Sequence, residues 1–296
     1  MAFKVYSGAN IAKTYLGGNR TSNNGDFTPL PPIVNPGLLF SLKYWLDPVV
    51  NTVATNGSDQ VTSISNSGAI GGGFSFYPGT STFDPATKAN FVGGTGNTKY
   101  YKFAGGQSDS MYTAWRSLKN DGITANTIIS ISRIVTTGYG QWSVSWTSDP
   151  AVSTGFVPGV RHPKNRNDNT LDMTIQSSGG SDVITPDSSL GSYTVGASNY
   201  TMFAATCTDG DWVNETDSIK FQTKINNQTS TSQSNPYAYT SYYPTFVIHQ
   251  AGDLDPGNDV GTDEYAAVMV FDEVLDEETI SGIYRYYSET RGYSIE

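Results

Sequence analysis

The chain has 296 residues, of which only 15% are charged, and 27 acidic against 17 basic side chains give a formal net charge of −10 at pH 7. Scarce charge combined with 31 Gly, 19 Tyr and 13 Phe favours many short strands joined by polar loops. An acidic surface repels phosphate backbones, which argues against nucleic-acid binding, and the single Cys207 excludes an intrachain disulfide. No apolar run approaches the ~20 residues needed to span a bilayer, so we expect no membrane insertion.

Residues 1–36 differ in character from the rest and are predicted to form a separate N-terminal segment. Two short β-type runs, 4–7 and 11–16, surround a turn, and Pro29, Pro31 and Pro32 make a stiff, extended linker. An isolated hairpin is marginally stable in water, so we expect this one to dock on the main domain or on a partner subunit. No charged stretch is followed by an apolar one, so we expect no signal peptide.

Residues 37–296 are predicted to form one domain of many strands. Apolar β-type runs lie between turn signals, and several alternate with a period of two, which places one face in a core. The predicted strands are 38–40, 42–46, 127–135, 141–146, 200–206, 219–225, 245–249 and 266–271. A short helix is predicted at 108–118, because Met111, Trp115 and Leu118 have helical spacing.

A second helix is predicted to begin after Asp276, which is a suitable N-cap followed by two glutamates. Arg285 and Glu289 are four residues apart and are expected to pair on the solvent side, and Gly292 is expected to end the helix. One apolar stripe is formed by Ile280, Ile283, Tyr284 and Tyr287.

Four motifs in residues 37–296 resemble the laminin-G-like branch of the concanavalin A-like lectin/glucanase fold. The run Leu42–Asp47 resembles the family's opening strand, with its Trp-Leu-Asp sequence, and Asn66–Gly68 resembles the turn that follows later. The paired strands 201–207 and 219–225 precede Asn226 and Asn227, where the family has an Asn-Gly-like turn, and 266–287 resembles its closing strand and helix. The resemblance implies an all-β fold: a two-sheet antiparallel jelly-roll sandwich with a short C-terminal helix, preceded here by the N-terminal β-segment.

The N-terminal runs Lys4–Gly8 and Lys13–Gly17 resemble the short β-segments that begin many tailed-phage virion proteins. This resemblance implies a phage tail, fibre or capsid-decoration protein, made in the host cytoplasm and located in the virion. Other virion proteins are the expected partners of residues 1–36, and we expect a homo-oligomer.

An acidic loop, 252–264, is the candidate metal site. Carboxylates at alternating positions can supply the six to eight oxygens that calcium takes, and the candidate ligands are Asp253, Asp255, Asp259 and Asp263. The loop departs from the EF-hand pattern, with Gly257 and Asn258 at the fifth and sixth positions, so a solvated acidic loop stands as the alternative. Calcium is the only cofactor that the sequence suggests.

Catalysis is not expected, because the required arrangements of residues are missing. The nearest carboxylate run, 273–278, does not have the spacing of the carboxylate pair that glycanases of this fold use as nucleophile and acid. His162 and His249 lie far apart in the sequence, and no Gly-x-Ser-x-Gly elbow or phosphate-binding loop occurs.

A tyrosine-rich run, 235–244, is the candidate ligand-binding surface. Sugars stack on flat aromatic rings with polar rims, and the candidate residues are Tyr237, Tyr239, Tyr242 and Tyr243. Tyrosine-rich surfaces also suit protein interfaces. The sequence therefore predicts a non-enzymatic virion protein whose lectin-like sandwich adheres to host surface polysaccharide or contacts neighbouring subunits. A cellular carbohydrate-binding lectin module with a calcium site is the alternative.

Overall fold

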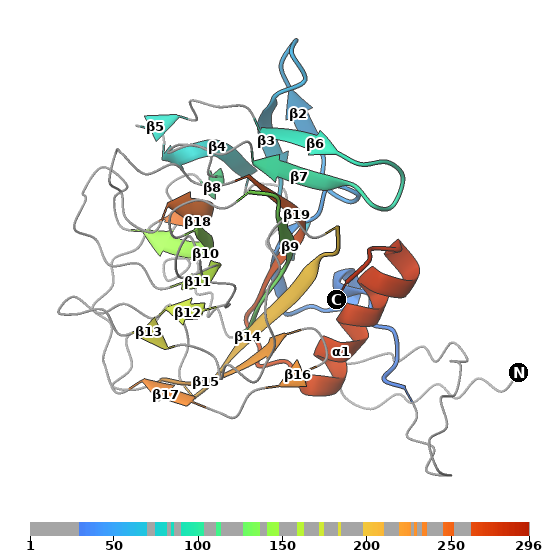
Figure 1. Cartoon of the computed structure of the whole chain (residues 1–296), viewed down its shortest axis with the longest axis vertical. Helices are drawn as coiled ribbons and strands as arrows, with labels where there is room; N and C mark the ends of the chain where they lie inside the picture. Colours follow the sequence, from blue (N-terminus) through green and yellow to red (C-terminus); the bar gives the residue numbers. More distant parts are fainter. Residues whose placement is uncertain are drawn as a thin grey trace, which may run out of the picture.

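The protein is an antiparallel β-sandwich with one C-terminal α-helix (Figure 1). The computed structural model describes residues 30–69, 75–81, 84–85, 90–103, 111–113, 127–136, 141–147, 159–162, 172–174, 183–184, 198–209, 219–225, 228–229, 233–235, 245–251 and 262–295. Every pairing between strands in these ranges is antiparallel. No helix within them has the length and apolar character needed to cross a membrane.

Sheet A has nine strands in the order β16-β15-β14-β9-β19-β7-β6, with β17 paired to β15 and β1 paired to β19. Its strands are β1 (Leu42–Leu46), β6 (Asn90–Gly93), β7 (Tyr100–Phe103), β9 (Thr127–Ile134), β14 (Thr201–Asp209), β15 (Ile219–Ile225), β16 (Gln228–Thr229), β17 (Gln233–Asn235) and β19 (Asp263–Phe271). Because β9 occupies one side of β19, β1 and β7 share the other side, one after the other along the strand.

Sheet B has ten strands in the order β13-β12-β11-β10-β18-β8-β4-β3-β2, with β5 paired to β4. Its strands are β2 (Val53–Thr55), β3 (Val61–Ser65), β4 (Ser75–Ser81), β5 (Asp84–Pro85), β8 (Met111–Thr113), β10 (Gln141–Thr147), β11 (Gly159–His162), β12 (Asp172–Thr174), β13 (Val183–Ile184) and β18 (Thr245–Ala251).

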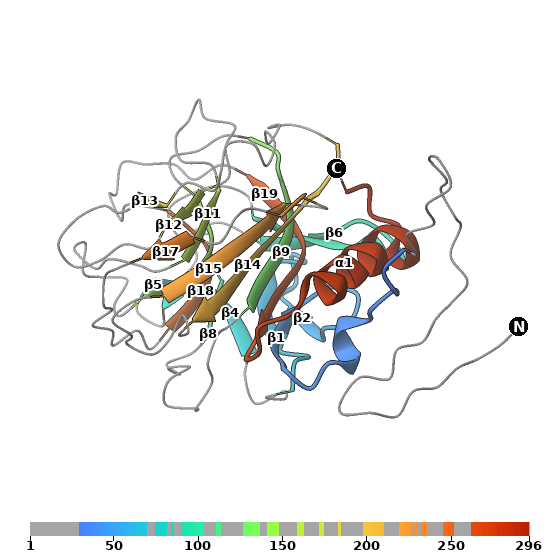
Figure 2. The ribbon, with the colours of Figure 1, turned by 90° about the horizontal axis from the view of Figure 1, so that it is seen from below.

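The strand β19 is buried along its whole length because both faces of sheet A are covered. Toward sheet B, the ring of Tyr44 packs edge-on against Phe76 of β4, with centroids 6.1 Å apart. On the other face, Met269 and Phe271 join a cluster with Ile280 and Ile283 of the helix α1 (Glu277–Arg285). Figure 2 shows α1 lying across β9, β14 and β19. Double burial explains why β19 is apolar at nearly every position.

The predicted C-terminal helix is confirmed, with its cap, ion pair and stop. The Asp276 carboxylate accepts a hydrogen bond from Thr279 N at 2.7 Å, and Arg285 donates to both carboxylate oxygens of Glu289 at 2.6 and 2.8 Å. After α1 the chain continues as a π-helical segment, Tyr286–Arg291, which ends at Gly292 with φ of 85°. Only glycine adopts this left-handed conformation at little cost, so it ends the helix here.

Seven of the eight predicted strands are present, and two local predictions are wrong. Residues 38–40 form no strand, because the Asn35 side chain caps a 3-10 helix, Pro36–Leu38, by accepting from Gly37 N. Within the predicted helix 108–118, the described residues Met111–Thr113 are the strand β8, paired between β4 and β18. The backbone hydrogen bonds to the two neighbouring strands stabilise a strand here more than the helical spacing of the apolar residues favours a helix.

The described part of the predicted linker, 30–36, packs against α1. Val34 N donates to Gly282 O at 3.0 Å, and the Arg285 guanidinium donates to Pro31 O. Ile33 and Val34 pack on the apolar cluster below the helix. Residues 1–29 lie outside the described residues, so their predicted role as an anchor, and the predicted boundary between residues 36 and 37, stay predictions.

Candidate functional site

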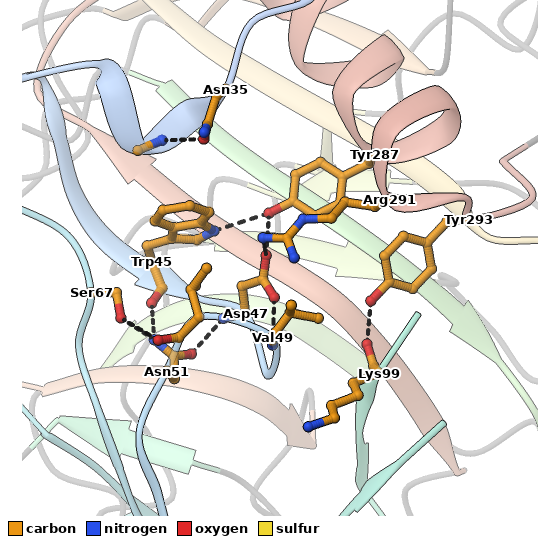
Figure 3. Close-up of polar contacts among 12 residues, drawn as sticks. Asn35, Trp45, Asp47, Val49, Asn51, Ser67, Lys99, Tyr287, Arg291 and Tyr293 are labelled. Atoms are coloured by element: carbon orange, nitrogen blue, oxygen red, sulfur yellow. Dashed lines mark hydrogen bonds and ion pairs between the residues drawn. The ribbon is translucent and has the colours of Figure 1, made fainter. Parts of the chain in front are cut away.

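A buried polar network joins β1 to the π-helical segment that follows α1 (Figure 3). Trp45 Nε1 donates to the Tyr287 hydroxyl at 2.9 Å, and that hydroxyl donates to Asp47 Oδ2 at 2.9 Å. An Arg291 guanidinium nitrogen lies 3.4 Å from the same carboxylate oxygen. All four side chains are buried. Hydrogen bonds in such a low-dielectric position are strong, and leaving one partner without the other is costly.

The Asp47 carboxylate also organises the turn that follows β1. Its Oδ1 accepts from Val49 N at 2.8 Å, while Asp47 N donates to Asn51 Oδ1 at 2.5 Å. The Asn51 amide returns to β1 by donating to Trp45 O at 2.8 Å. The Asp47 carboxylate and the Asn51 amide thus hold the turn that follows β1 in one conformation.

Burial governs the ionisation of this network. Desolvation raises the pKa of Asp47 above its ordinary value of 3.8, although Arg291 and the hydrogen bonds from the turn act in the opposite direction. Burial, with the nearby Asp47 charge, raises the pKa of Tyr287 well above 10. Tyr287 therefore remains a neutral hydroxyl that can donate to Asp47 at any pH where the protein is studied.

The Asn66–Gly68 turn binds to the outer edge of β1 in place of a neighbouring strand. Asn66 Oδ1 accepts from Trp45 N at 2.8 Å, and its Nδ2 donates to Lys43 O at 2.9 Å. A Cβ on Gly68 would lie 2.1 Å from Lys43 O, so no side chain fits there without moving backbone. This geometry gives a physical reason for the separated Trp-Leu-Asp and Asn-Ser-Gly motifs in the sequence.

The network is buried and connects the opening strand to the C-terminal segment. Its hydroxyl, carboxylate and amide groups are engaged with one another, and Asp47 is fully buried. Across the described ranges, no three His, Cys, Asp or Glu side chains gather as metal ligands would. The signal that sequence reasoning missed is the pairing of Trp45 with Tyr287, 242 residues later.

A second polar cluster lies on the outer face of sheet A, beyond the end of α1. Arg133 of β9 contacts Glu264 Oε2 of β19 through Nε at 2.6 Å and a terminal nitrogen at 2.5 Å, and it also donates to Ser198 O at 3.0 Å. Its guanidinium carbon lies 5.7 and 5.2 Å from the ring centroids of Tyr100 and Tyr200. The cluster ties β7, β9 and β19 to the residues just before β14, and cation–π contacts add to its stability.

The strands that flank the predicted metal loop belong to different sheets, β18 to sheet B and β19 to sheet A. Ala251 of β18 is opposite Gln141 of β10, and Asp263 of β19 is opposite both Ile134 and Phe103. Asp263 is 1% exposed, and its carboxylate accepts from the Tyr265 hydroxyl at 3.2 Å. The other candidate ligands, Asp253, Asp255 and Asp259, lie outside the described residues, so the calcium site stays a prediction.

Residues 236–244 of the tyrosine-rich run connect β17 of sheet A to β18 of sheet B. Thr245 of β18 is opposite Thr147 of β10, while Asn235 of β17 is opposite Ile219 of β15. Because β18 runs from Thr245 to Ala251, the two candidate loops leave it in opposite directions. The candidate ligand-binding residues themselves lie outside the described part of the chain: Tyr237, Tyr239, Tyr242 and Tyr243.

No protein-family model and no curated protein matches this sequence. Among solved structures, the chain is similar to the botulinum neurotoxin serotype D binding domain, with a TM-score of 0.51 and 10% identity over 83% of this chain and 52% of that one. It is similar to the botulinum neurotoxin DC binding domain in complex with rat synaptotagmin II, with a TM-score of 0.51 and 13% identity over 84% and 52%. The fold is a β-sandwich.

A Trypanosoma rangeli sialidase in complex with sialic acid is also similar, with a TM-score of 0.53 and 11% identity over 88% of this chain and 36% of that one. The chain thus spans about half the length of the neurotoxin binding domains and about a third of the sialidase. At these identities the similarity shows the fold alone. These comparisons give no evidence for the laminin-G-like or the virion resemblance, so both stay predictions.

Proposed function

We propose that this protein is a non-enzymatic binding protein of a phage virion, with a glycan-binding surface formed by residues 236–244, which connect β17 of sheet A to β18 of sheet B. Its concanavalin A-like fold is part of the same proposal. The three similar structures support a binding role at the level of fold. They are two neurotoxin binding domains, one in complex with rat synaptotagmin II, and a sialidase in complex with sialic acid. Fold alone does not decide function, so the argument depends on the position of the candidate residues.

The observation that carries the proposal is that residues 236–244 connect two described strands of different sheets. Asn235 of β17 is opposite Ile219 in sheet A, and Thr245 of β18 is opposite Thr147 in sheet B. Loops held at the end of a rigid double sheet are common positions for ligand-binding residues. Four tyrosines in this segment offer ring faces for the apolar side of a sugar and hydroxyls for its polar rim.

A glycan array probed with the labelled full-length protein tests the binding role. We expect a defined set of host surface polysaccharides to bind. Replacing Tyr242 and Tyr243 together by alanine should weaken that binding about tenfold or more, since aromatic contacts of this kind contribute about 1 kcal/mol or more each. Tyr77→Ala is the matched control, because Tyr77 is an exposed tyrosine on β4, outside the segment. Absence of any bound glycan, or equal losses in both variants, would contradict the proposal.

The absence of enzymatic activity is part of the proposal and has its own test. The buried Asp47 is held by Tyr287, Val49 N and the turn it caps, which is an arrangement for stability. Incubation of the protein with each glycan that it binds should release no sugar product detectable by chromatography. Turnover above the protein-free control would show that the sandwich is catalytic.

Attachment to a particle is assigned in this proposal to residues 1–29, because residues 31–34 are held against α1. A virion origin predicts that the protein co-purifies with phage particles through a density gradient and is detected in them by mass spectrometry. Its presence only in the soluble fraction of the lysate would contradict this role.

A further inference from the structure

An exposed apolar surface lies beside the start of α1. Leu38 is 71% exposed, Phe40 is 87% exposed and Val274 is 43% exposed. The two segments that carry them are neighbours, because Asp272 N donates to Ser41 O at 3.0 Å and Leu42 is opposite Phe271 in the sheet. We refer to Leu38, Phe40 and Val274 as the Phe40 surface. A large apolar side chain presented in this way is typical of an interaction surface.

Hydrogen bonds and an ion pair hold the backbone that carries the Phe40 surface, so the exposure of these side chains is a property of the fold. Phe40 O accepts from Lys43 Nζ at 3.2 Å, and the same ammonium group lies 2.9 Å from an Asp272 carboxylate oxygen. On the other side, the capped 3-10 helix Pro36–Leu38 sets the position of Leu38. Two segments far apart in the sequence thus present these side chains together.

The rim of the Phe40 surface is acidic. Four exposed carboxylates follow Asp272 within six residues, at Glu273, Asp276, Glu277 and Glu278. The helix dipole offsets only about half a charge at this terminus, so the rim stays negative. A partner that fits should therefore combine apolar side chains with positive charge.

Residues 1–29 have this combination. They contain Lys4, Lys13 and Arg20 against one acidic residue, Asp26, so their net charge is +2, whereas residues 30–296 carry 14 basic and 26 acidic side chains, a net charge of −12. The runs 4–7 and 11–16 supply apolar and aromatic side chains next to the lysines.

The same segment joins the sandwich within reach of the surface. Pro31 and Val34 are bonded to Arg285 and Gly282, so residues 31–41 run along α1 toward its start (Figure 2). The nine residues of α1, Glu277–Arg285, span about 12 Å from first to last, whereas 29 residues can extend to about 95 Å. Because the segment is tethered, its effective concentration at the surface is high.

We infer that residues 1–29 dock on the Phe40 surface of the same chain in the free protein. The contact goes beyond the proposed glycan binding and does not depend on it. The contact holds residues 1–29, the segment proposed for particle attachment, against the sandwich. Attachment to a particle would therefore require residues 1–29 to leave the Phe40 surface.

Limited trypsin digestion of the full-length protein tests the contact, because trypsin cleaves after Lys4, Lys13 and Arg20. The Phe40→Ser variant should be cleaved at these positions about tenfold faster than the unmodified protein, which corresponds to about 1.4 kcal/mol of docking. Val50→Ser is the matched control, since Val50 is an exposed apolar residue beyond the other end of β1. Its cleavage rate should be unchanged, and both variants should keep the melting temperature of the unmodified protein.

Two further conditions decide the inference. Raising the salt concentration should speed cleavage of the unmodified protein, because salt screens the attraction between the lysines and the acidic rim. Protection should be independent of protein concentration. Equal cleavage rates in the Phe40→Ser variant and the unmodified protein would overturn the contact, and protection that grows with protein concentration would assign the surface to a second copy.

Discussion

Replacing Tyr287 by phenylalanine removes a single buried oxygen atom from the centre of the β1 network. That oxygen accepts from Trp45 Nε1 and donates to Asp47 Oδ2, both at 2.9 Å. The ring itself stays in the apolar cluster, where it packs edge-on against Tyr286. The substitution therefore tests the polar network and leaves the packing of the helix nearly unchanged.

The expected loss of stability follows from the two broken hydrogen bonds. The bond to Asp47 is charge-assisted and contributes about 1.5–3 kcal/mol, and an unsatisfied buried indole N–H costs about 1–3 kcal/mol. These two effects overlap, so we expect the free energy of unfolding to fall by about 3 kcal/mol. For a domain of this size, that is a decrease in melting temperature of about 6–12 °C.

Urea unfolding followed by tryptophan fluorescence measures this loss, with the midpoint expected to fall at unchanged slope. Tyr284→Phe, in α1 just before the π-helical segment that carries Tyr287, is the matched control. The Tyr284 hydroxyl is half-buried and donates to Ile295 O at 3.1 Å, so its removal should cost about 1 kcal/mol or less. Equal losses in the two variants would refute the conclusion that the Trp45–Tyr287–Asp47 network stabilises the closure of the sandwich.

Three further predictions concern packing, ionisation and metal binding. Gly282→Ala should lower the melting temperature, because the added Cβ would lie 2.4 Å from Pro32 O. The cost of this overpacking, about 1–3 kcal/mol, exceeds the ~1 kcal/mol that alanine gains over glycine in helix propensity. A higher melting temperature would contradict this prediction. Burial raises the pKa of Asp47, so the folded protein keeps this proton to a higher pH than the unfolded chain does. Relative to Asp47→Asn, the unfolding free energy of the unmodified protein should therefore fall as the pH rises above about 4, the ordinary pKa of an aspartate, and a rise would reverse the assigned direction. If the loop 252–264 binds calcium, saturating calcium at ~100 times its Kd should stabilise the protein by about 2.7 kcal/mol in a thermal melt, and Asp259→Asn should remove that gain. Identical melts with calcium and with chelator would leave the loop as a solvated acidic one.

Local sequence patterns predicted the elements whose signals lie within a few neighbouring residues. The cap at Asp276 and the stop at Gly292 are such signals, and both are present. The apolar run that became β19 was predicted as a strand, and its near-continuous apolar character reflects burial against both sheet B and α1. The β-type runs 200–206 and 219–225 likewise predicted the strands β14 and β15.

Features that depend on distant residues could not be predicted in this way. The short run 38–40 has strand-forming residues, but Asn35 and Pro36 begin a 3-10 helix just before it. The helical spacing of Met111 and Trp115 was overridden at Met111 by pairing with β4 and β18. Asp47 contacts Tyr287 and Arg291, which come from the other end of the chain. Of the candidate site residues, Asp263 alone lies in the described structure, and its burial reflects its place at the start of a central strand.

The pairing of β1 with β19 has a consequence for how the protein is made. β1 comes from the first fifth of the chain, whereas β19 and Tyr287 come from its last eighth, so the nascent chain must keep β1 without its neighbour until nearly all of the sandwich has been synthesised. Contacts between such distant residues slow folding and leave strand edges open during synthesis. Ribosomal release before Tyr287 would therefore give an aggregation-prone chain rather than a smaller working domain.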